Sequence, residues 1–303
     1  MNLPNTTADT AWDERNNVEI RRIGSASEIS HEPAEPYEFV VPGLSGGPLD
    51  IVGLYAPSAS KTLIVTFHGS LQRSKYQLPR FEWRRTLTDL DAGVLLIADS
   101  TLELGENLPL CWYIGTAEQN LPDDIADLVR QVAADGGYEH VVLTGSSGGG
   151  FAAMAVSHRL PGSLAVSFSP QTRVGDYIPW VHKVFVNAAF PGYDTIDAVE
   201  EEFPERVNLR RLYANPEIPN YVRYVQNSND TGHVEDHYAP FAAARFMDPA
   251  TGGVDPNGRL RLVLEPMQQG HEPPSRGRFL RHLKEAHEEV FATPLGDSKM
   301  NSE

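Results

Sequence analysis

HVVLTGSSGGGFAAMAV, residues 140–156, is the stretch of the 303-residue chain from which its architecture can be inferred. It opens with the apolar run His140–Leu143 and closes with Phe151–Val156, whose residues favour the start of a helix. Between them stands GSSGG, which places Ser147 at the centre of a Gly-x-Ser-x-Gly pattern. A strand that turns sharply into a helix at such a pattern exposes the serine hydroxyl at the edge of a sheet. The stretch therefore predicts a strand, a tight turn and a helix, with Ser147 at the turn.

Glycines stand two residues before and two residues after Ser147. Side chains at these positions would clash in so tight a turn, and Gly145 and Gly149 carry none. Ser146 fails the same test, because Thr144 would occupy its preceding glycine position. The alternative is a glycine-rich turn that binds a phosphate, but the stretch lacks the lysine of a P-loop and its spacing is not G-x-G-x-x-G. We therefore interpret Ser147 as a nucleophile.

Two backbone amides are candidates for stabilising a negatively charged oxygen beside this serine. Because a helix begins directly after the turn, the N–H of Gly148 points to where an oxyanion would form. The apolar run at 62–67 leads directly into His68-Gly69-Ser70, where Gly69 permits a close backbone approach and the N–H of Ser70 would donate. The alternative for this second segment is an ordinary glycine turn after a strand.

A nucleophilic serine needs a histidine to accept its proton. Among the ten histidines, His271 follows the apolar run 260–264 through a short loop and precedes a helix. A loop after the last strand can reach the carboxyl edge of the sheet, where Ser147 is expected. The other histidines considered come too early in the chain or lie on helices: His68, His140, His158, His282 and His287.

The third partner is a carboxylate that orients the histidine. Asp230 comes just after the strand candidate Tyr221–Val225, from where it could reach His271. Asp236 is the alternative acid, followed by Glu235. Asp230 can also be explained by plain turn chemistry, since Asp is favoured in turns.

The segment after Asp230 permits a competing interpretation. His233 and His237 are spaced as helical metal ligands can be, with Asp230 as a third ligand. The simpler alternative is that these histidines line the pocket or cap a helix. We expect His233, together with His68, Gly69 and Ser146, to line a substrate pocket.

Apolar strands and amphipathic helices alternate along the chain, which favours a doubly wound, mostly parallel α/β sheet with helices on both faces. The clearest helices are Leu121–Asp135, which Gly136 would end, and Arg276–Phe291, for which Ser275 is the expected N-cap. The aromatic- and proline-rich segment 171–219 is expected to be a helical insertion, either a cap over the pocket or an elaborated crossover. The strand candidates are 38–41, 50–55, 62–67, 94–98, 140–143, 164–168, 221–225 and 260–264.

Composition bounds the remaining possibilities. The 41 acidic and 25 basic residues give a net charge of −16, which disfavours a polyanion such as nucleic acid. Arg80, Arg84 and Arg85 form a short basic run that we interpret as a solvated face of a helix. Residues 1–35 and 293–303 lack periodicity and are expected to be a mobile arm and a flexible tail. No apolar run spans a bilayer, no signal peptide is visible, and the single cysteine excludes an internal disulfide, so we expect a soluble cytoplasmic protein.

Over residues 36–292 the pattern resembles the α/β-hydrolase superfamily, because the strand-borne His68-Gly69, the turn at Ser147, then Asp230 and His271 occur in that superfamily's order. The resemblance implies an eight-stranded sheet, Ser147, His271 and Asp230 as nucleophile, base and acid, and no metal or organic cofactor. It also implies Gly148 and Ser70 as oxyanion donors. One departure is that no further glycines follow Gly69, unlike the HGGG type.

These expectations indicate a serine esterase that acts on a small-molecule or glycan-linked acyl ester through an acyl-enzyme. Two alternatives remain open. The same three residues would serve an acyltransferase whose acceptor is an alcohol, and a catalytically silent binding module would keep the fold without the activity. The sequence does not indicate the oligomeric state.

Overall fold

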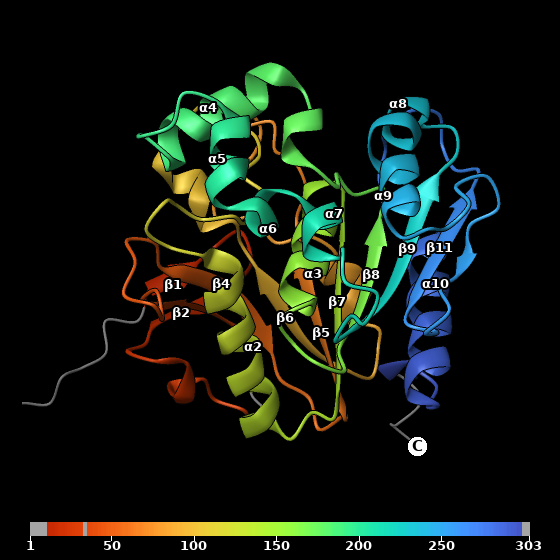
Figure 1. Cartoon of the computed structure of the whole chain (residues 1–303). Coiled ribbons are helices and arrows are strands. Elements are labelled where there is room, and N and C mark those ends of the chain that lie inside the picture. The colour runs from red at the N-terminus through yellow and green to blue at the C-terminus, as the bar shows by residue number, and fades with distance from the viewer. Residues whose placement is uncertain (1–10, 33–34, 299–303) are drawn as a thin grey trace, which may run out of the picture.

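The computed structural model describes residues 11–32 and 35–298, which build a single sheet with helices on both faces (Figure 1). The sheet has eleven strands in the order β1-β2-β3-β4-β6-β5-β7-β8-β9-β11-β10. Neighbours from β6 through β5, β7, β8 and β9 to β11 are all parallel. The strands are β1 Ala11–Asp13, β2 Val18–Arg22, β3 Tyr37–Val41, β4 Ile51–Ala56, β5 Thr62–Phe67, β6 Gly93–Ile97, β7 His140–Ser146, β8 Leu164–Phe168, β9 Tyr221–Asn227, β10 Gly253–Val254 and β11 Leu260–Glu265.

All eight strand candidates of the sequence are present, as β3 to β9 and β11. The expected total of eight is nevertheless too small, because β1, β2 and β10 extend the sheet at its two ends. These three strands are short and mostly exposed or half-buried, so they lack the continuous apolar run that marks the central strands.

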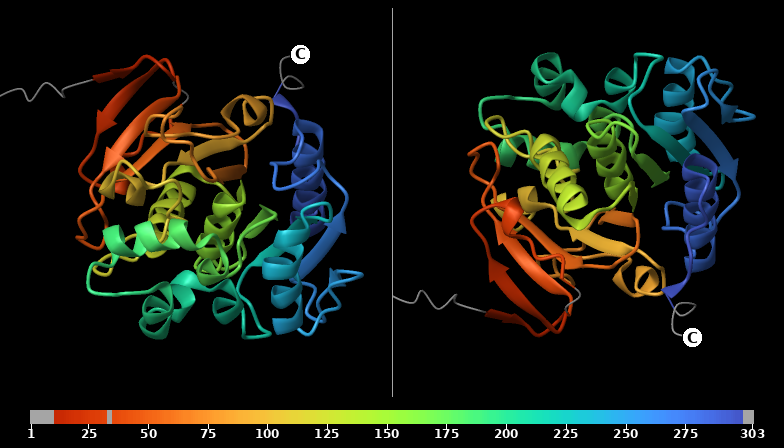
Figure 2. Two further views of the ribbon diagram at one scale, coloured as in Figure 1. Left: turned by 90° about the horizontal axis from the view of Figure 1, so that it is seen from above. Right: turned by 90° about the horizontal axis from the view of Figure 1, so that it is seen from below.

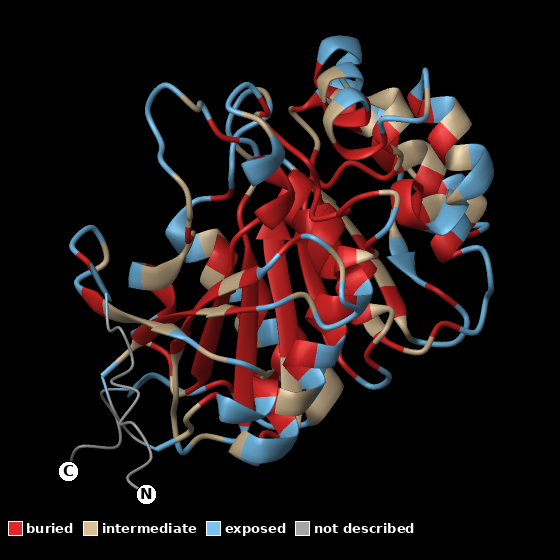
Figure 3. Cartoon of the chain, turned by 90° about the vertical axis from the view of Figure 1, so that its left-hand side faces the viewer, coloured by how far each residue is buried: buried red, intermediate tan, exposed pale blue. Residues whose placement is uncertain are grey.

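The central strands are apolar on both sides because both faces of the sheet are covered. In β5, Leu63, Val65 and Phe67 pack in the cluster that contains helix α2, whereas Ile64 packs in the cluster that contains helices α1 and α10. Successive side chains of a strand point to opposite faces, so the run must be apolar throughout. Views along the sheet show the helices on its two sides, and the buried residues concentrate in the strands between them (Figures 2 and 3).

The helices are α1 Arg84–Leu87, α2 Leu121–Gly136, α3 Gly148–Ser157, α4 Pro179–Ala189, α5 Ile196–Glu202, α6 Pro204–Val207, α7 Leu209–Leu212, α8 Thr231–His233, α9 Ala239–Ala244 and α10 Arg276–Phe291. Short helical turns, η1 to η4, occur at Ala26–Glu28, Ser100–Leu104, Val174–Asp176 and Val234–Tyr238. Helix α10 has the predicted bounds, and the Ser275 side chain accepts a hydrogen bond from the Arg278 amide as its N-cap. Helix α2 runs one residue further than expected, because Gly137 rather than Gly136 takes the left-handed conformation that ends it, at φ +67°.

Both terminal segments differ from the mobile arm and tail that the sequence suggested. Within residues 11–32, β2 pairs with β3, and the Arg21 guanidinium lies 3.9 Å from the centre of the Tyr37 ring. At the other end, Leu295 is buried, and the Ser298 amide donates to the Asp89 carbonyl at 2.8 Å. A few apolar contacts and backbone pairs are enough to dock these polar segments. Residues 1–10, 33–34 and 299–303 lie outside the described residues.

The predicted helical insertion contains η3 and α4 to α7 (Figure 1). Val181, Phe185 and Val186 of α4 are buried in one cluster with Trp112. The Arg206 guanidinium donates to the carbonyls of Ile114, Thr116 and Gln119 at 2.7–2.8 Å, which ties the insertion to the loop before α2. The insertion therefore packs on the body of the fold, and a role as a cap stays a prediction. Among the described residues, we find no helix of the length and apolarity that a bilayer crossing requires.

Glu38 on β3 gives a testable consequence of burying a carboxyl. It is 3% exposed, and its Oε2 has no hydrogen-bond partner among the described residues. Burial, and after it the Asp13 carboxyl, raise the pKa of Glu38 to about 7. A carboxyl whose pKa is higher in the folded chain stabilises the fold below its unfolded pKa of 4.5, and this contribution is lost as the pH rises through about 7.

We therefore expect Glu38→Gln to be more stable than the wild type at pH 8, by about 1–3 kcal/mol, and the difference to shrink towards pH 5. Chemical denaturation at both pH values measures this. Glu14→Gln, at an exposed position between β1 and β2, is the control and should show no such trend. A wild type that is the more stable protein at pH 8 would contradict the expectation.

Candidate active site

Ser147 lies at the sharp turn between β7 and α3. Its backbone has φ +56° and ψ −124°, a strained conformation for a residue with a side chain. A Cβ on Gly145 would lie 2.4 Å from the carbonyl of Gly149, and a Cβ on Gly149 would lie 2.3 Å from the Phe67 carbonyl oxygen. Both glycines are therefore required for the turn, as the pattern predicted.

Four polar side chains meet above the carboxyl edge of the sheet. Ser147 follows β7, Gln171 follows β8, Asp230 follows β9 and His271 follows β11, and these four strands are neighbours. Parallel strands end at the same edge, which is where open α/β sheets place their functional groups.

Ser147, His271 and Asp230 form a continuous hydrogen-bonded chain. The Oγ of Ser147 lies 2.8 Å from Nε2 of His271, and Nδ1 of the same ring lies 2.6 Å from Oδ2 of Asp230. The alternative acid, Asp236, makes no such contact, and its backbone carbonyl accepts a hydrogen bond from Arg210. Of the three acids considered, Asp230, Asp236 and Glu235, the structure brings Asp230 to the histidine.

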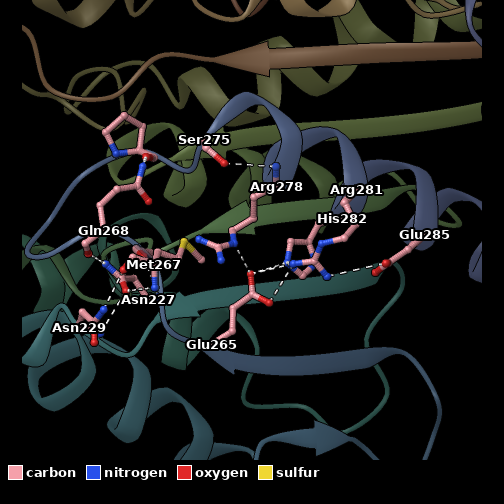
Figure 4. Close-up of polar contacts among 12 residues, drawn as sticks. Asn227, Asn229, Glu265, Met267, Gln268, Ser275, Arg278, Arg281, His282 and Glu285 are labelled. Atoms are coloured by element: carbon pink, nitrogen blue, oxygen red, sulfur yellow. Dashed lines mark hydrogen bonds and ion pairs between the residues drawn. The ribbon is translucent and has the colours of Figure 1, made fainter.

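The loop that carries His271 is held by two asparagines at the end of β9 (Figure 4). The side-chain amide of Asn227 donates to the carbonyls of Gln268 at 2.7 Å and Gly270 at 2.9 Å, and its Oδ1 accepts from the Met267 amide at 2.9 Å. Asn229 donates to the Met267 carbonyl at 2.7 Å. The strand that presents Asp230 thus also fixes the loop that presents its partner.

Gln171 is a fourth member of this group that the sequence analysis did not identify. It is fully buried, and its Nε2 lies 2.9 Å from the Ser147 Oγ and 2.9 Å from Nε2 of His233. Its Oε1 accepts a hydrogen bond from the indole N–H of Trp112 at 3.1 Å. A signal existed: Gln171 stands three residues after β8, beside the strand of the nucleophile.

The indole of Trp112 sets the direction of the hydrogen bonds that Gln171 makes. An indole nitrogen can only donate, so the Gln171 oxygen must face it and the amide NH₂ must face Ser147 and His233. Ser147 Oγ therefore accepts from Gln171. It donates to Nε2 of a neutral His271, because the proton of that ring lies on Nδ1 and faces the Asp230 carboxylate. The Nε2 of His233 must likewise be unprotonated, which leaves its proton on Nδ1, 3.2 Å from Oδ2 of Asp230.

Asp230 serves both imidazoles, which stack face to face with ring centres 3.7 Å apart. Burial acts to raise the pKa of Asp230, but hydrogen bonds from His233 and His271 outweigh it and hold this pKa well below its usual range. Burial lowers the pKa of His233, although Asp230 opposes the shift. The group therefore combines an ionised Asp230 with a His233 ring whose burial favours its neutral form.

The metal alternative proposed from the sequence is only partly reflected in the geometry. Asp230, His233 and His271 present ligand atoms within 4.8 Å of one another, so these three could hold a metal ion. His237 is not in this group, because its Nδ1 accepts from the Thr172 amide and its ring is buried. Burial, and then His233, lower the pKa of His237 to about 2. Within this group, Nδ1 of both rings already lies close to Oδ2 of Asp230, at 2.6 and 3.2 Å.

The segment after β5 lies against the nucleophile. A Cβ on Gly69 would lie 3.6 Å from the Ser147 Cβ and 3.1 Å from the Ser146 carbonyl oxygen, so Gly69 permits the close approach that was expected. His68 is buried, its Nδ1 lies 2.8 Å from the Gly69 carbonyl, and its Nε2 accepts from the Asp99 amide at 3.2 Å. Burial lowers the pKa of His68 to about 4. This neutral histidine fixes the loop rather than presenting a free group to a pocket.

Ser70, Ser146 and Tyr177 complete the surroundings. The Ser70 side chain is exposed and donates to the Pro109 carbonyl at 3.4 Å, whereas Ser146 is buried at the end of β7. Tyr177, from the helical insertion, packs edge-on against Trp112 and against His233. The insertion therefore contacts the group that surrounds the nucleophile.

Several solved structures have a fold similar to that of this chain. The capsule O-acetyltransferase of Neisseria meningitidis serogroup A, in a mutant bound to CoA, is 13% identical with a TM-score of 0.59, and the match covers 80% of this chain and 95% of that one. The S-formylglutathione hydrolase from Agrobacterium tumefaciens is 15% identical with a TM-score of 0.53, covering 86% and 99%. Prolyl oligopeptidase B from Galerina marginata is 12% identical with a TM-score of 0.54, covering 89% and 39%.

These structural neighbours are α/β-hydrolases, and this chain has the α/β-hydrolase fold that the sequence indicated. The likeness is one of fold, because the identities are low. No family model and no curated protein sequence matches the chain.

Proposed function

We propose that the protein is a serine hydrolase that cleaves carboxylic esters through an acyl-enzyme on Ser147. The single observation that supports it best is the chain of contacts from the strained serine through His271 to Asp230, at 2.8 and 2.6 Å. A nucleophile, a base and an orienting carboxylate in this arrangement are what acyl transfer requires.

In the proposed first step, His271 Nε2 takes the Ser147 proton while Oγ attacks the ester carbonyl. Asp230 accepts the hydrogen bond from Nδ1 and stabilises the imidazolium that forms. Gln171 occupies one lone pair of Oγ and so holds the oxygen towards the substrate. His271 then gives its proton to the departing alcohol, and a water, activated by the same ring, releases the acid.

Two amides are proposed to hold the oxyanion. The N–H of Gly148 opens helix α3 and has no partner within the helix. The N–H of Ser70 has no acceptor among the described residues, whereas the neighbouring Gly69 amide lies beside the Glu82 carboxyl. Donors of this kind each contribute about 3 kcal/mol to stabilising the transition state.

A second candidate is transfer of the acyl group to an alcohol instead of water. The similarity in fold to a capsule O-acetyltransferase bound to CoA supports this second candidate. A panel of aryl and alkyl esters, with and without sugar alcohols as acceptors, tests both. Release of free acid alone supports a hydrolase, and formation of a new ester supports a transferase. If the wild type cleaves none of the esters faster than the Ser147→Ala variant does, both candidate functions are contradicted.

We further propose that Gln171 is a positioning residue. Gln171→Leu keeps the volume but removes the donor to Ser147 and leaves Trp112 and His233 without their partner. We expect kcat to fall about tenfold with little change in KM, because one buried hydrogen bond is lost near the reacting atom. Trp112→Phe, which frees the amide to rotate, should produce a smaller loss in the same direction.

Steady-state kinetics on one ester measures both variants, with Gln131→Leu on the exposed face of α2 as the matched control. Unchanged kcat in Gln171→Leu would contradict the positioning role.

A further inference from the structure

A pocket with a volume of about 1080 Å³ lies between the β1–β2 turn and the segment that leads from β5 to α1. Its lining contains the three arginines that the sequence analysis interpreted as a solvated helix face. The structure instead brings them together with cations from elsewhere. The six basic residues that line it are Arg15, Arg73, Lys75, Arg80, Arg84 and Arg85.

This concentration of positive charge contrasts with the rest of the chain. The net charge is −16, with only 25 basic residues in all, yet six of these line one pocket and face a single acidic residue, Glu82. A concave surface of one sign concentrates the local field and attracts the opposite charge. An anion repelled by the molecule as a whole would therefore still be drawn to this place.

Most of these cations are not neutralised by an acid. Lys75 and Arg85 are exposed and pair with no carboxylate among the described residues. The Arg73 guanidinium donates to the carbonyls of Leu102, Gly105 and Leu108, and Arg84 donates to the Asn16 carbonyl. Hydrogen bonds to neutral carbonyls fix these two guanidinium groups in place without cancelling their charge.

Two of the six form an ion pair with a carboxylate. Arg15 lies 3.3 Å from the buried Asp13 carboxylate, and Arg80 lies 3.8 Å from Glu82 while its guanidinium packs over the Tyr76 ring. Planar guanidinium groups in a pocket are well suited to phosphate, which they bind with paired hydrogen bonds.

One end of the pocket adjoins the proposed active site. Glu82 lines the pocket, and its carboxyl lies beside the Gly69 amide. Gly69 in turn packs against Ser147, with only 3.6 Å between its Cβ position and the Ser147 Cβ. Arg73 and Arg80 are also near enough to influence His68. Glu82 and Gly69 thus link the pocket to the nucleophile, although neither Gly69 nor Ser147 lines the pocket itself.

We propose that this basic pocket binds phosphate groups of a small-molecule ligand, and that the ligand is the phosphorylated part of the ester substrate or acyl donor. The proposal of a phosphate site depends only on the composition of the pocket. Its assignment to the substrate rests on the function proposed above.

The first experiment measures binding without turnover. Pyrophosphate is titrated calorimetrically into wild type, into Lys75→Gln/Arg85→Gln, and into Lys61→Gln/Arg130→Gln, a matched pair of exposed cations outside the pocket. We expect the pocket variant to bind about tenfold more weakly and the control to bind like wild type, since only the pocket variant loses charges that face the bound anion. Both substituted cations are exposed and lack acidic partners, and thermal unfolding checks that the fold is kept. No binding by wild type, or equal binding by all three proteins, would overturn the phosphate site.

The second experiment asks whether the bound phosphate belongs to the substrate. The kcat/KM of a phosphorylated ester is divided by that of a neutral ester with the same acyl group. This preference should fall about tenfold in the pocket variant and stay unchanged in the control. An unchanged preference would overturn the substrate assignment. The wild type could cleave neither ester while the pocket variant still binds pyrophosphate more weakly than the wild type does. In that case the proposed hydrolase function is wrong and the phosphate site is supported.

Discussion

Ser147→Ala is expected to lower kcat/KM for ester hydrolysis by at least about 10⁴-fold. Within the part of the chain that the structure describes, the Ser147 Oγ is the one oxygen found within hydrogen-bond distance of His271 Nε2, and the substitution removes it. The remaining activity would come from direct attack of water on the ester, with the oxyanion stabilised by the two backbone amides. Initial rates on an activated aryl ester, with active enzyme titrated beforehand, measure the loss.

The neighbouring Ser146→Ala is the matched control. It removes a buried hydroxyl of the same turn that makes no contact with His271, so its rates should stay within about a few-fold of wild type. If Ser146→Ala were the inactive variant and Ser147→Ala the active one, the assignment of the nucleophile would be reversed. Equal hydrolysis by wild type and Ser147→Ala would remove the basis for the proposed function.

Asp230→Asn is expected to lower kcat by about 10³- to 10⁴-fold with a much smaller effect on KM. In the wild type one carboxylate oxygen accepts from Nδ1 of both His271 and His233. An amide turned with its NH₂ towards the rings would force their protons onto Nε2. His271 could then no longer accept the Ser147 proton, and His233 would direct a donor at Gln171.

Asp236→Asn separates this expectation from a general effect of losing an acid near α8. The Asp236 side chain makes no contact with either ring, so the variant should keep nearly full activity. Unfolding curves of both variants show whether stability has changed. A loss in Asp236→Asn with full activity in Asp230→Asn would transfer the orienting role to the other acid.

The fold was largely predictable because the decisive signals are local. Gly145 is required by a contact of 2.4 Å with Gly149, only four residues away, and so local a demand leaves a pattern in the sequence. Continuous apolar runs identified the eight central strands for a similar reason, since both faces of the sheet are covered. Chain order and the common edge of parallel strands then led to His271 and Asp230.

What the sequence did not reveal depends on contacts between distant segments. Gln171 acquires its importance from Trp112, which is 59 positions away, and no local pattern links the two. Strands β1 and β2 are mostly exposed or half-buried and carry polar residues, so they resembled an arm. The basic pocket combines Arg15 with Arg73 to Arg85, which only the folded chain brings together. Arg80, Arg84 and Arg85 alone looked like a solvated surface.

Covalent labelling with a fluorophosphonate probe, read out by peptide mass spectrometry, tests most directly whether Ser147 is an activated nucleophile. One adduct per chain is expected on residue 147 in wild type and in Ser146→Ala, with no adduct in Ser147→Ala and strongly slowed labelling in His271→Ala. An unlabelled wild type, or labelling that persists in Ser147→Ala, would contradict the account.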